Sequence, residues 1–169
     1  MPKGILVVIG GAEDKGIEKK EENSEKKDNE QPGEEQDNSN EILRAFVKLM
    51  RKESPLIEVV TTSSGEPDGA FEDYKKVFGK LGVRRVHHMN LKNRGEVLDD
   101  KLEKRVQEAD AFFFTGGDQL KLTSIYGGTP FLTDLKNRYI SDRIIIGGTS
   151  AGAMALSTPM INAGSKEKQ

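Results

Sequence analysis

Residues 144–153 read IIIGGTSAGA and place a serine between small residues directly after an apolar run. Ser150 is the centre of a G-x-S-x-G pattern over residues 148–152. In many hydrolases this pattern forms a sharp, strained turn from a strand into a helix, and the small flanking residues let the turn hold the serine hydroxyl clear of the backbone. The pattern therefore predicts that Ser150 is a nucleophile. A tight structural turn is the alternative.

A serine nucleophile normally needs a base, which in most serine hydrolases is a histidine. No histidine follows Gly152 before residue 169. The two histidines, His87 and His88, lie next to each other at the end of an apolar run. Adjacent strand residues point to opposite faces, so the pair is not expected to bind a metal ion together. His88 as the base for Ser150 is a less favoured interpretation.

A second glycine-rich segment also follows an apolar run. Residues 112–119 read FFFTGGDQ, with two glycines directly after the apolar residues. A plain turn is one interpretation of these glycines. The functional interpretation is an oxyanion hole, in which backbone N–H groups stabilise the charge that develops on the attacked carbonyl oxygen. The amide of Ala151, the residue after the serine, would supply the other donor.

Charge is concentrated in one stretch of the chain. Residues 18–41 carry ten acidic residues and four lysines and lack large apolar side chains, which is typical of a disordered, solvated insertion. The remainder carries a formal charge of only +4, so we expect no nucleic-acid or membrane partner. The chain has no cysteine, which excludes disulfides and a cysteine nucleophile. The first apolar run is too short for a signal peptide or a membrane span, which favours a cytoplasmic protein.

Short apolar runs alternate with amphipathic stretches along the chain. The runs predict strands over residues 5–9, 57–61, 84–88, 111–114 and 143–146, mostly buried on both faces. Apolar residues at helical spacing predict helices over residues 41–51, 68–81, 97–106, 131–139 and 150–156. This alternation predicts a doubly wound, flavodoxin-like α/β domain with a mainly parallel sheet and helices on both faces. Ligands bind such sheets beyond the carboxyl ends of the strands. Ser150 and residues 115–119, called the glycine loop below, both fall at this edge.

Four segments together resemble the cyanophycinases, members of a serine peptidase family that also contains the aspartyl dipeptidases. They are residues 9–15 (IGGAEDK), 113–120 (FFTGGDQL), 127–130 (GGTP) and 148–153 (GTSAGA). Their order and spacing are also similar to the family pattern. The dipeptidases typically have a glycine–asparagine pair where this chain has Asp118 and Gln119, so the cyanophycinase branch is the better match. The resemblance covers the chain except for residues 18–41.

The resemblance implies a homodimeric, cofactor-free peptidase without a metal ion and with a fold like that of the class I glutamine amidotransferases. Such enzymes release β-aspartyl-arginine dipeptides from cyanophycin, a poly-aspartate that carries arginine on its side-chain carboxyls. Position by position, the resemblance implies that Ser150 is the nucleophile and that Gln119 binds substrate. It also implies that the backbone of Gly117 and Asp118 contributes to the oxyanion hole, together with Ala151.

Family members continue beyond the position that corresponds to Gln169, into a segment that bears the catalytic histidine, the catalytic acid and substrate-binding arginines. We therefore expect residues 1–169 to form a single α/β domain that is incomplete at its C-terminal side. We also expect this chain alone to be nearly inactive, because losing a triad member leaves only residual catalysis. An incomplete sheet further predicts that the strand over 144–146 has an uncovered face or neighbour.

Three alternatives remain open from the sequence. The first is a homologue that binds peptides without cleaving them. The second is a peptidase for other β-aspartyl peptides, since one fold and motif can serve several substrates. The third is an unrelated α/β-hydrolase esterase, which is disfavoured because residues 116–119 do not match the oxyanion motif of those enzymes.

Overall fold

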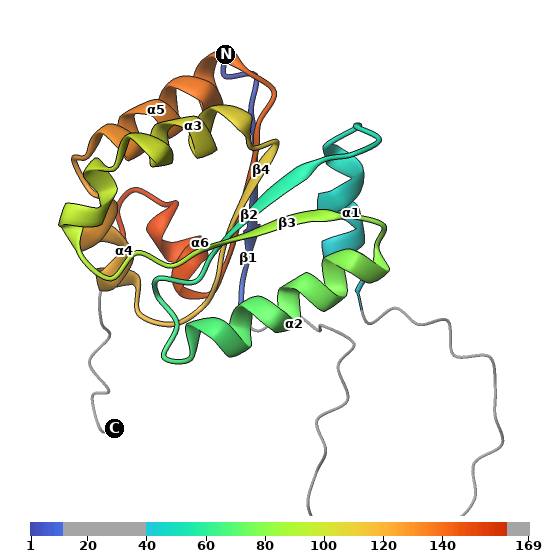
Figure 1. Cartoon of the computed structure of the whole chain (residues 1–169), viewed down its shortest axis with the longest axis horizontal. Helices are drawn as coiled ribbons and strands as arrows, with labels where there is room; N and C mark the ends of the chain where they lie inside the picture. Colours follow the sequence, from blue (N-terminus) through green and yellow to red (C-terminus); the bar gives the residue numbers. More distant parts are fainter. Residues whose placement is uncertain (12–39, 162–169) are drawn as a thin grey trace, which may run out of the picture.

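The computed structural model describes residues 1–11 and 40–161. In this part of the chain, five parallel strands form one sheet with helices on both faces, which confirms the predicted α/β class (Figure 1). The strands are β1 (Ile5–Ile9), β2 (Leu56–Val60), β3 (Arg85–Met89), β4 (Ala111–Phe114) and β5 (Ile145–Thr149). Their order across the sheet is β1-β5-β4-β2-β3, so the strand that leads to Ser150 lies between β1 and β4.

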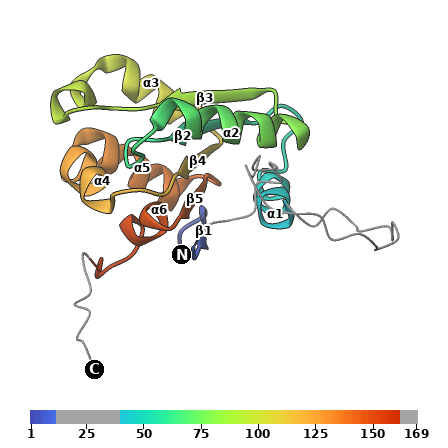
Figure 2. The ribbon, with the colours of Figure 1, turned by 90° about the horizontal axis from the view of Figure 1, so that it is seen from below.

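The helices divide between the two faces of the sheet (Figure 2). One face is covered by α1 (Glu41–Leu49) and α2 (Pro67–Lys80). The other is covered by the 3₁₀-helix η1 (Arg94–Leu98) and by α3 (Asp100–Glu108), α4 (Gln119–Tyr126), α5 (Pro130–Ser141) and α6 (Ala151–Ala155). The start of α1 falls at the end of the predicted acidic insertion, whose residues 18–39 lie outside the described part of the chain.

Aromatic side chains of β4 fill both cores because successive strand residues point to opposite faces. Phe113 packs against Phe46 and Phe78 at ring-centroid distances of 5.3 and 5.7 Å. On the other face, Phe112 packs edge-on against Phe131 of α5 at 5.8 Å. Burial on both faces, predicted for most strands, holds for β2, β4 and β5 but not for the edge strands β1 and β3, whose residues alternate in exposure.

Two local predictions on the second face need correction. The helix predicted over 97–106 is two helices, because the Asp99 carboxylate accepts a hydrogen bond from the Lys101 amide and starts α3 separately from η1. Helix α4 was not predicted.

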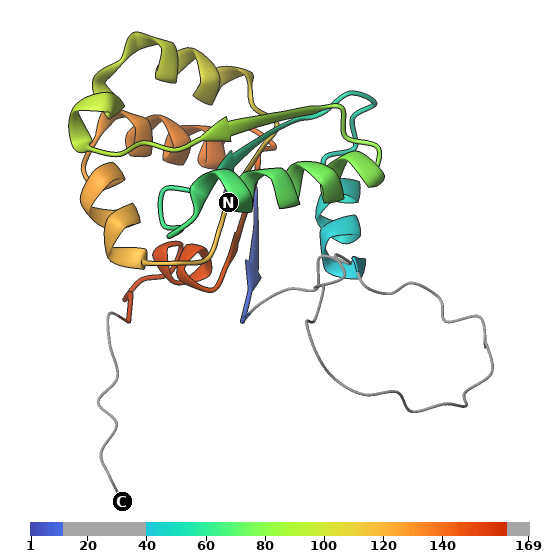
Figure 3. The same cartoon turned by 60° about the horizontal axis from the view of Figure 1, so that its bottom comes forward.

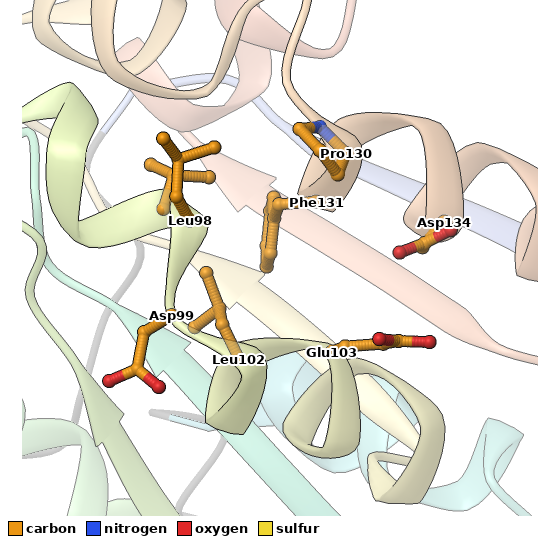
Figure 4. Close-up of a pocket in the computed structure, with 8 residues that line it drawn as sticks. Leu98, Asp99, Leu102, Glu103, Pro130, Phe131 and Asp134 are labelled. Carbon is orange, nitrogen blue, oxygen red and sulfur yellow. The ribbon is translucent and has the colours of Figure 1, made fainter.

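A pocket of about 140 Å³ lies between η1, α3 and α5, with Leu98, Leu102 and Phe131 in its lining (Figure 4). Its lining shares no residue with the Ser150 turn.

The expectation that the strand over 144–146 has an uncovered face or neighbour is met by its neighbour β1 and not by the strand itself. Ile144, Ile145 and Ile146 are buried, since β5 is paired on both sides. Edge strand β1 instead exposes Leu6 and Val8, with exposed fractions of 41% and 62%. Leu6 is in register with Ile146, so the described residues leave apolar surface of β1 uncovered on the face of α6.

Two kinds of feature are absent from the described residues. No helix in this part of the chain is long and apolar enough to cross a membrane. No group of three or more histidine, aspartate or glutamate side chains there is arranged to hold a metal ion.

Candidate active site

The candidate residues lie at the carboxyl edge of the sheet, where β4 and β5 end. In Figure 3 the connection from β4 to α4 runs beside α6, which follows the Ser150 turn. Parallel strands bring their carboxyl ends to one edge, and this topology places the two glycine-rich segments together. A Cβ atom built on Gly116 would lie 3.4 Å from Ser150 Cβ and 3.9 Å from Ser150 Oγ. The loop after β4 therefore borders the serine directly.

Ser150 lies between β5 and α6 in a backbone conformation that L residues rarely adopt. Its φ is 49° and its ψ is −113°, which costs a non-glycine residue on the order of 1–3 kcal/mol. Hydrogen bonds hold the turn: the Ser150 amide donates to Ile9 O at 3.1 Å, and the Met154 amide donates to Ser150 O at 2.9 Å. The hydroxyl of Thr149 donates to Gly11 O at 2.8 Å. Ser150 is exposed, as a nucleophile must be.

The small residues of the pattern are required by close packing around this turn. A Cβ atom on Gly152 would lie 2.2 Å from Phe114 O, and one on Gly148 would lie 2.6 Å from Gly152 C. No side chain fits at either contact, since real Cβ atoms do not approach so closely. The first turn of α6 can therefore pack directly on the end of β4. This packing brings Ser150 to the Gly116 loop.

The loop after β4 is fixed from the neighbouring strand β2. Gly117 has a φ of 137°, and a Cβ atom there would lie 2.0 Å from Ser63 O. The Asp118 amide donates to the same Ser63 oxygen at 2.9 Å. The Asp118 carboxylate accepts the Leu120 amide at 2.8 Å and caps α4. In the structure, both polar groups of Asp118 thus anchor the loop.

Gln119, the predicted substrate-binding residue, is the first residue of α4 and is buried. Its side-chain Nε2 donates to Ile161 O at 3.1 Å. This bond ties the segment after α6 to the start of α4, directly beside the glycine loop. Ala151, the other predicted oxyanion donor, is the first residue of α6 and therefore has no acceptor within its own helix for its amide.

The two histidines lie away from Ser150. They belong to β3, which is separated from β5 by β4 and β2, a span of roughly 14 Å at the usual strand spacing. His88 Nε2 shares a 2.7 Å hydrogen bond with the Thr61 hydroxyl, and its ring stacks on Phe71 with centroids 4.3 Å apart. Within the described part of the chain, neither histidine reaches Ser150 as a base.

Burial lowers the pKa of His88 below its ordinary value, and nearby Arg105 lowers it further, whereas Asp68 and Glu72 raise it. The folded protein thus binds fewer protons at His88 than the unfolded chain, and its stability falls as the pH falls below about 6.5. We expect a His88→Gln variant to lose less free energy of unfolding than the wild type between pH 7.5 and pH 5.5. Urea unfolding at both pH values measures the free energy of unfolding of each protein. If the variant and the wild type lose the same amount between the two pH values, the prediction is wrong.

The structure shows a residue to which the sequence assigned no role. Ser63, just after β2, contacts the loop at Thr115, Gly116 and Asp118. Beside it, the Thr62 hydroxyl bonds the Tyr126 hydroxyl at 2.9 Å, and burial raises the pKa of Tyr126, so this phenol stays neutral. The sequence signal that could have drawn attention to Ser63 is the run of hydroxyl residues over 61–64, directly after a buried strand.

The fold and the turn define an α/β protein with a serine on a strained strand-to-helix turn beside a glycine loop. Residues 32–169 match the sequence profile of peptidase family S51. The chain belongs to this family of serine peptidases.

Relatives of known name agree with this assignment. The chain is 30% identical to cyanophycinase from Synechococcus elongatus over 96% of its own length and 44% of that protein. It is 28% identical to cyanophycinase from Geminocystis herdmanii, over 96% of the chain and 52% of that protein. The chain thus spans about half the length of the curated relatives it matches.

Solved structures share the fold. A peptidase from an acI-B1 Actinobacterium has a TM-score of 0.57 at 22% identity, over 75% of this chain and 54% of the other. A putative peptidase E from Listeria monocytogenes has a TM-score of 0.50 at 20% identity, over 65% of this chain and 54% of the other.

Proposed function

We propose that Ser150 is the nucleophile of a cyanophycinase-like exopeptidase, which releases β-aspartyl-arginine dipeptides from cyanophycin. The observation that carries this proposal is the strained, exposed conformation of Ser150 with the Gly116 backbone against it. Strained backbone positions of this kind cluster at active sites and ligand-binding sites. The similarity to cyanophycinases supports the substrate class.

In this mechanism Ser150 Oγ attacks the carbonyl carbon of a main-chain peptide bond between two aspartates and gives its proton to a base, so the isopeptide bond to arginine stays intact in the released dipeptide. The C–N bond breaks, the amine leaves with that proton, and water then hydrolyses the acyl-enzyme. The amides of Gly117 and Ala151 stabilise the oxyanion. The Asp118 backbone, also predicted to contribute, holds the loop through Ser63 O. Gln119 contacts the substrate beside this loop.

Neither His87 nor His88 lies near Ser150, so the proposal takes the base and the acid from the segment that the resemblance implies beyond the position of Gln169. We expect residues 1–169 alone to turn over substrate poorly for the same reason. The same observation favours a second candidate, a homologue that binds β-aspartyl peptides without cleaving them.

The homodimer that the resemblance implies belongs to the proposal as well, and light scattering on the full-length protein tests it.

The experiment uses the full-length protein and measures two reactions. Release of β-aspartyl-arginine from cyanophycin is followed by mass spectrometry. Labelling by a fluorophosphonate is mapped to the tryptic peptide over residues 144–166. We expect both reactions, with the label on Ser150. Binding of β-aspartyl-arginine without labelling or release would favour the non-catalytic homologue, and cleavage of other β-aspartyl peptides but not cyanophycin would correct the substrate.

A further inference from the structure

Ser63 is a buried residue that contacts the glycine loop with both its side chain and its backbone. It is 1% exposed and follows β2, which neighbours β4 in the sheet. Its hydroxyl proton is shared between Thr115 O at 2.9 Å and Gly116 O at 3.1 Å. Its carbonyl oxygen accepts the Asp118 amide at 2.9 Å. One side chain and one carbonyl thus fix the loop at three positions.

The loop lies between Ser63 and Ser150. On the Ser63 side, the Cα of Gly117 approaches so closely that a Cβ atom would lie 2.0 Å from Ser63 O. On the other side, a Cβ atom on Gly116 would lie 3.4 Å from Ser150 Cβ. Any movement of the loop relative to Ser63 therefore changes the distance between the Gly117 amide and an oxyanion formed at Ser150.

We propose that Ser63 is a positioning residue that fixes the peptide groups of residues 115–118 in register with Ser150. This inference rests on the proposed function of Ser150. The Ser63 hydroxyl orients the carbonyls of Thr115 and Gly116, and a peptide plane that is fixed at its carbonyl is also fixed at the N–H of the next residue. The carbonyl of Gly116 shares its plane with the amide of Gly117. The hydroxyl therefore sets the direction of the Gly117 donor.

A Ser63→Ala variant tests this, because it removes the hydroxyl and keeps the carbonyl that accepts the Asp118 amide. A misplacement of about 1 Å at a reacting group costs on the order of a hundredfold in rate. We expect fluorophosphonate labelling of Ser150 in the full-length protein to slow by about ten- to a hundredfold. We expect kcat for a β-aspartyl peptide to fall similarly while KM changes by less than about twofold, because the oxyanion forms only in the transition state.

Two further variants separate positioning from folding. Ser63→Cys keeps a donor at this position, but a weaker one, and should give an intermediate labelling rate. Ser64→Ala is the matched control, since the Ser64 hydroxyl accepts the Glu66 amide at 3.1 Å and no hydrogen bond joins it to residues 115–118 of the described chain. We expect it to label at the wild-type rate. Hydrogen–deuterium exchange should quicken over residues 115–118 in Ser63→Ala and not in Ser64→Ala.

The outcomes separate the two proposals. If wild-type Ser150 is labelled and Ser63→Ala is labelled within about twofold of that rate, the positioning role is wrong and the proposed nucleophile stands. If wild-type Ser150 is not labelled, the proposed function fails, and the oxyanion role of the loop fails with it. Unchanged exchange over residues 115–118 in Ser63→Ala overturns the positioning role whether or not Ser150 is labelled.

Discussion

Replacing Ser150 with glycine in the full-length protein is expected to abolish fluorophosphonate labelling and to lower kcat by about a millionfold, while raising the free energy of unfolding by about 1 kcal/mol. The loss follows from removal of the proposed nucleophile. The gain follows from the φ of 49° and ψ of −113°, which glycine adopts without the clash of a Cβ atom. The relief of roughly 1–3 kcal/mol exceeds the extra chain entropy of glycine, which is about 0.5–1 kcal/mol.

Two variants make this prediction specific. Ser150→Ala should lose activity equally but gain no stability, because alanine keeps the Cβ atom in the strained conformation. Ser124→Gly is the control for the residue change, since Ser124 lies within α4, where glycine should destabilise by about 0.5–1 kcal/mol. Urea unfolding measures the free energy of unfolding of the three variants relative to the wild type. A Ser150→Gly variant less stable than Ser150→Ala would show that the turn stores no strain.

Strand positions could be predicted from the sequence because they depend on local patterns. The runs over 5–9 and 111–114 coincide with β1 and β4. The run over 143–146 begins before β5 (Ile145–Thr149) and misses its end, since Gly147 and Gly148 do not have the composition of a strand. They continue the strand because β1 and β4 pair with them on both sides. Such pairing depends on residues that are far apart in the chain.

Helix α4 and the contacts of Ser63 were missed for different reasons. In α4, Leu120 is exposed and Leu122 is buried, so its apolar residues do not form one clear helical stripe. The position of Ser150 was predictable because its neighbours must be small for a local turn to form. Ser63, by contrast, acts on a loop more than fifty positions later, where it contacts Thr115 and Gly116. No spacing rule connects two loops that meet only through the order of the strands.

Replacing Arg105 with methionine is expected to lower the free energy of unfolding by about 3 kcal/mol. Glu58 lies on β2 and is fully buried, and the Arg105 guanidinium of α3 donates to both of its carboxylate oxygens, at 3.1 and 2.5 Å. The same guanidinium donates to His88 O at 2.6 Å. Its removal would leave a buried carboxylate without its cation and detach α3 from two strands. Arg105 keeps some exposure, so we place the loss at the lower end for buried pairs.

We attribute the expected loss of stability in Arg105→Met to the unpaired Glu58 carboxylate, and not to the lost attraction between Glu58 and Arg105. A second substitution separates these two causes. A Glu58→Leu/Arg105→Met variant removes both charges and should recover most of the stability, since apolar residues often replace buried ion pairs without loss. Lys104→Met is the control on the same helix, because Lys104 forms an exposed pair with Glu108 at 3.7 Å that should contribute less than about 1 kcal/mol. Urea unfolding of the four proteins tests this. If the double variant is as unstable as Arg105→Met, the ion pair itself holds α3 on the sheet, and the buried charge is not the cause.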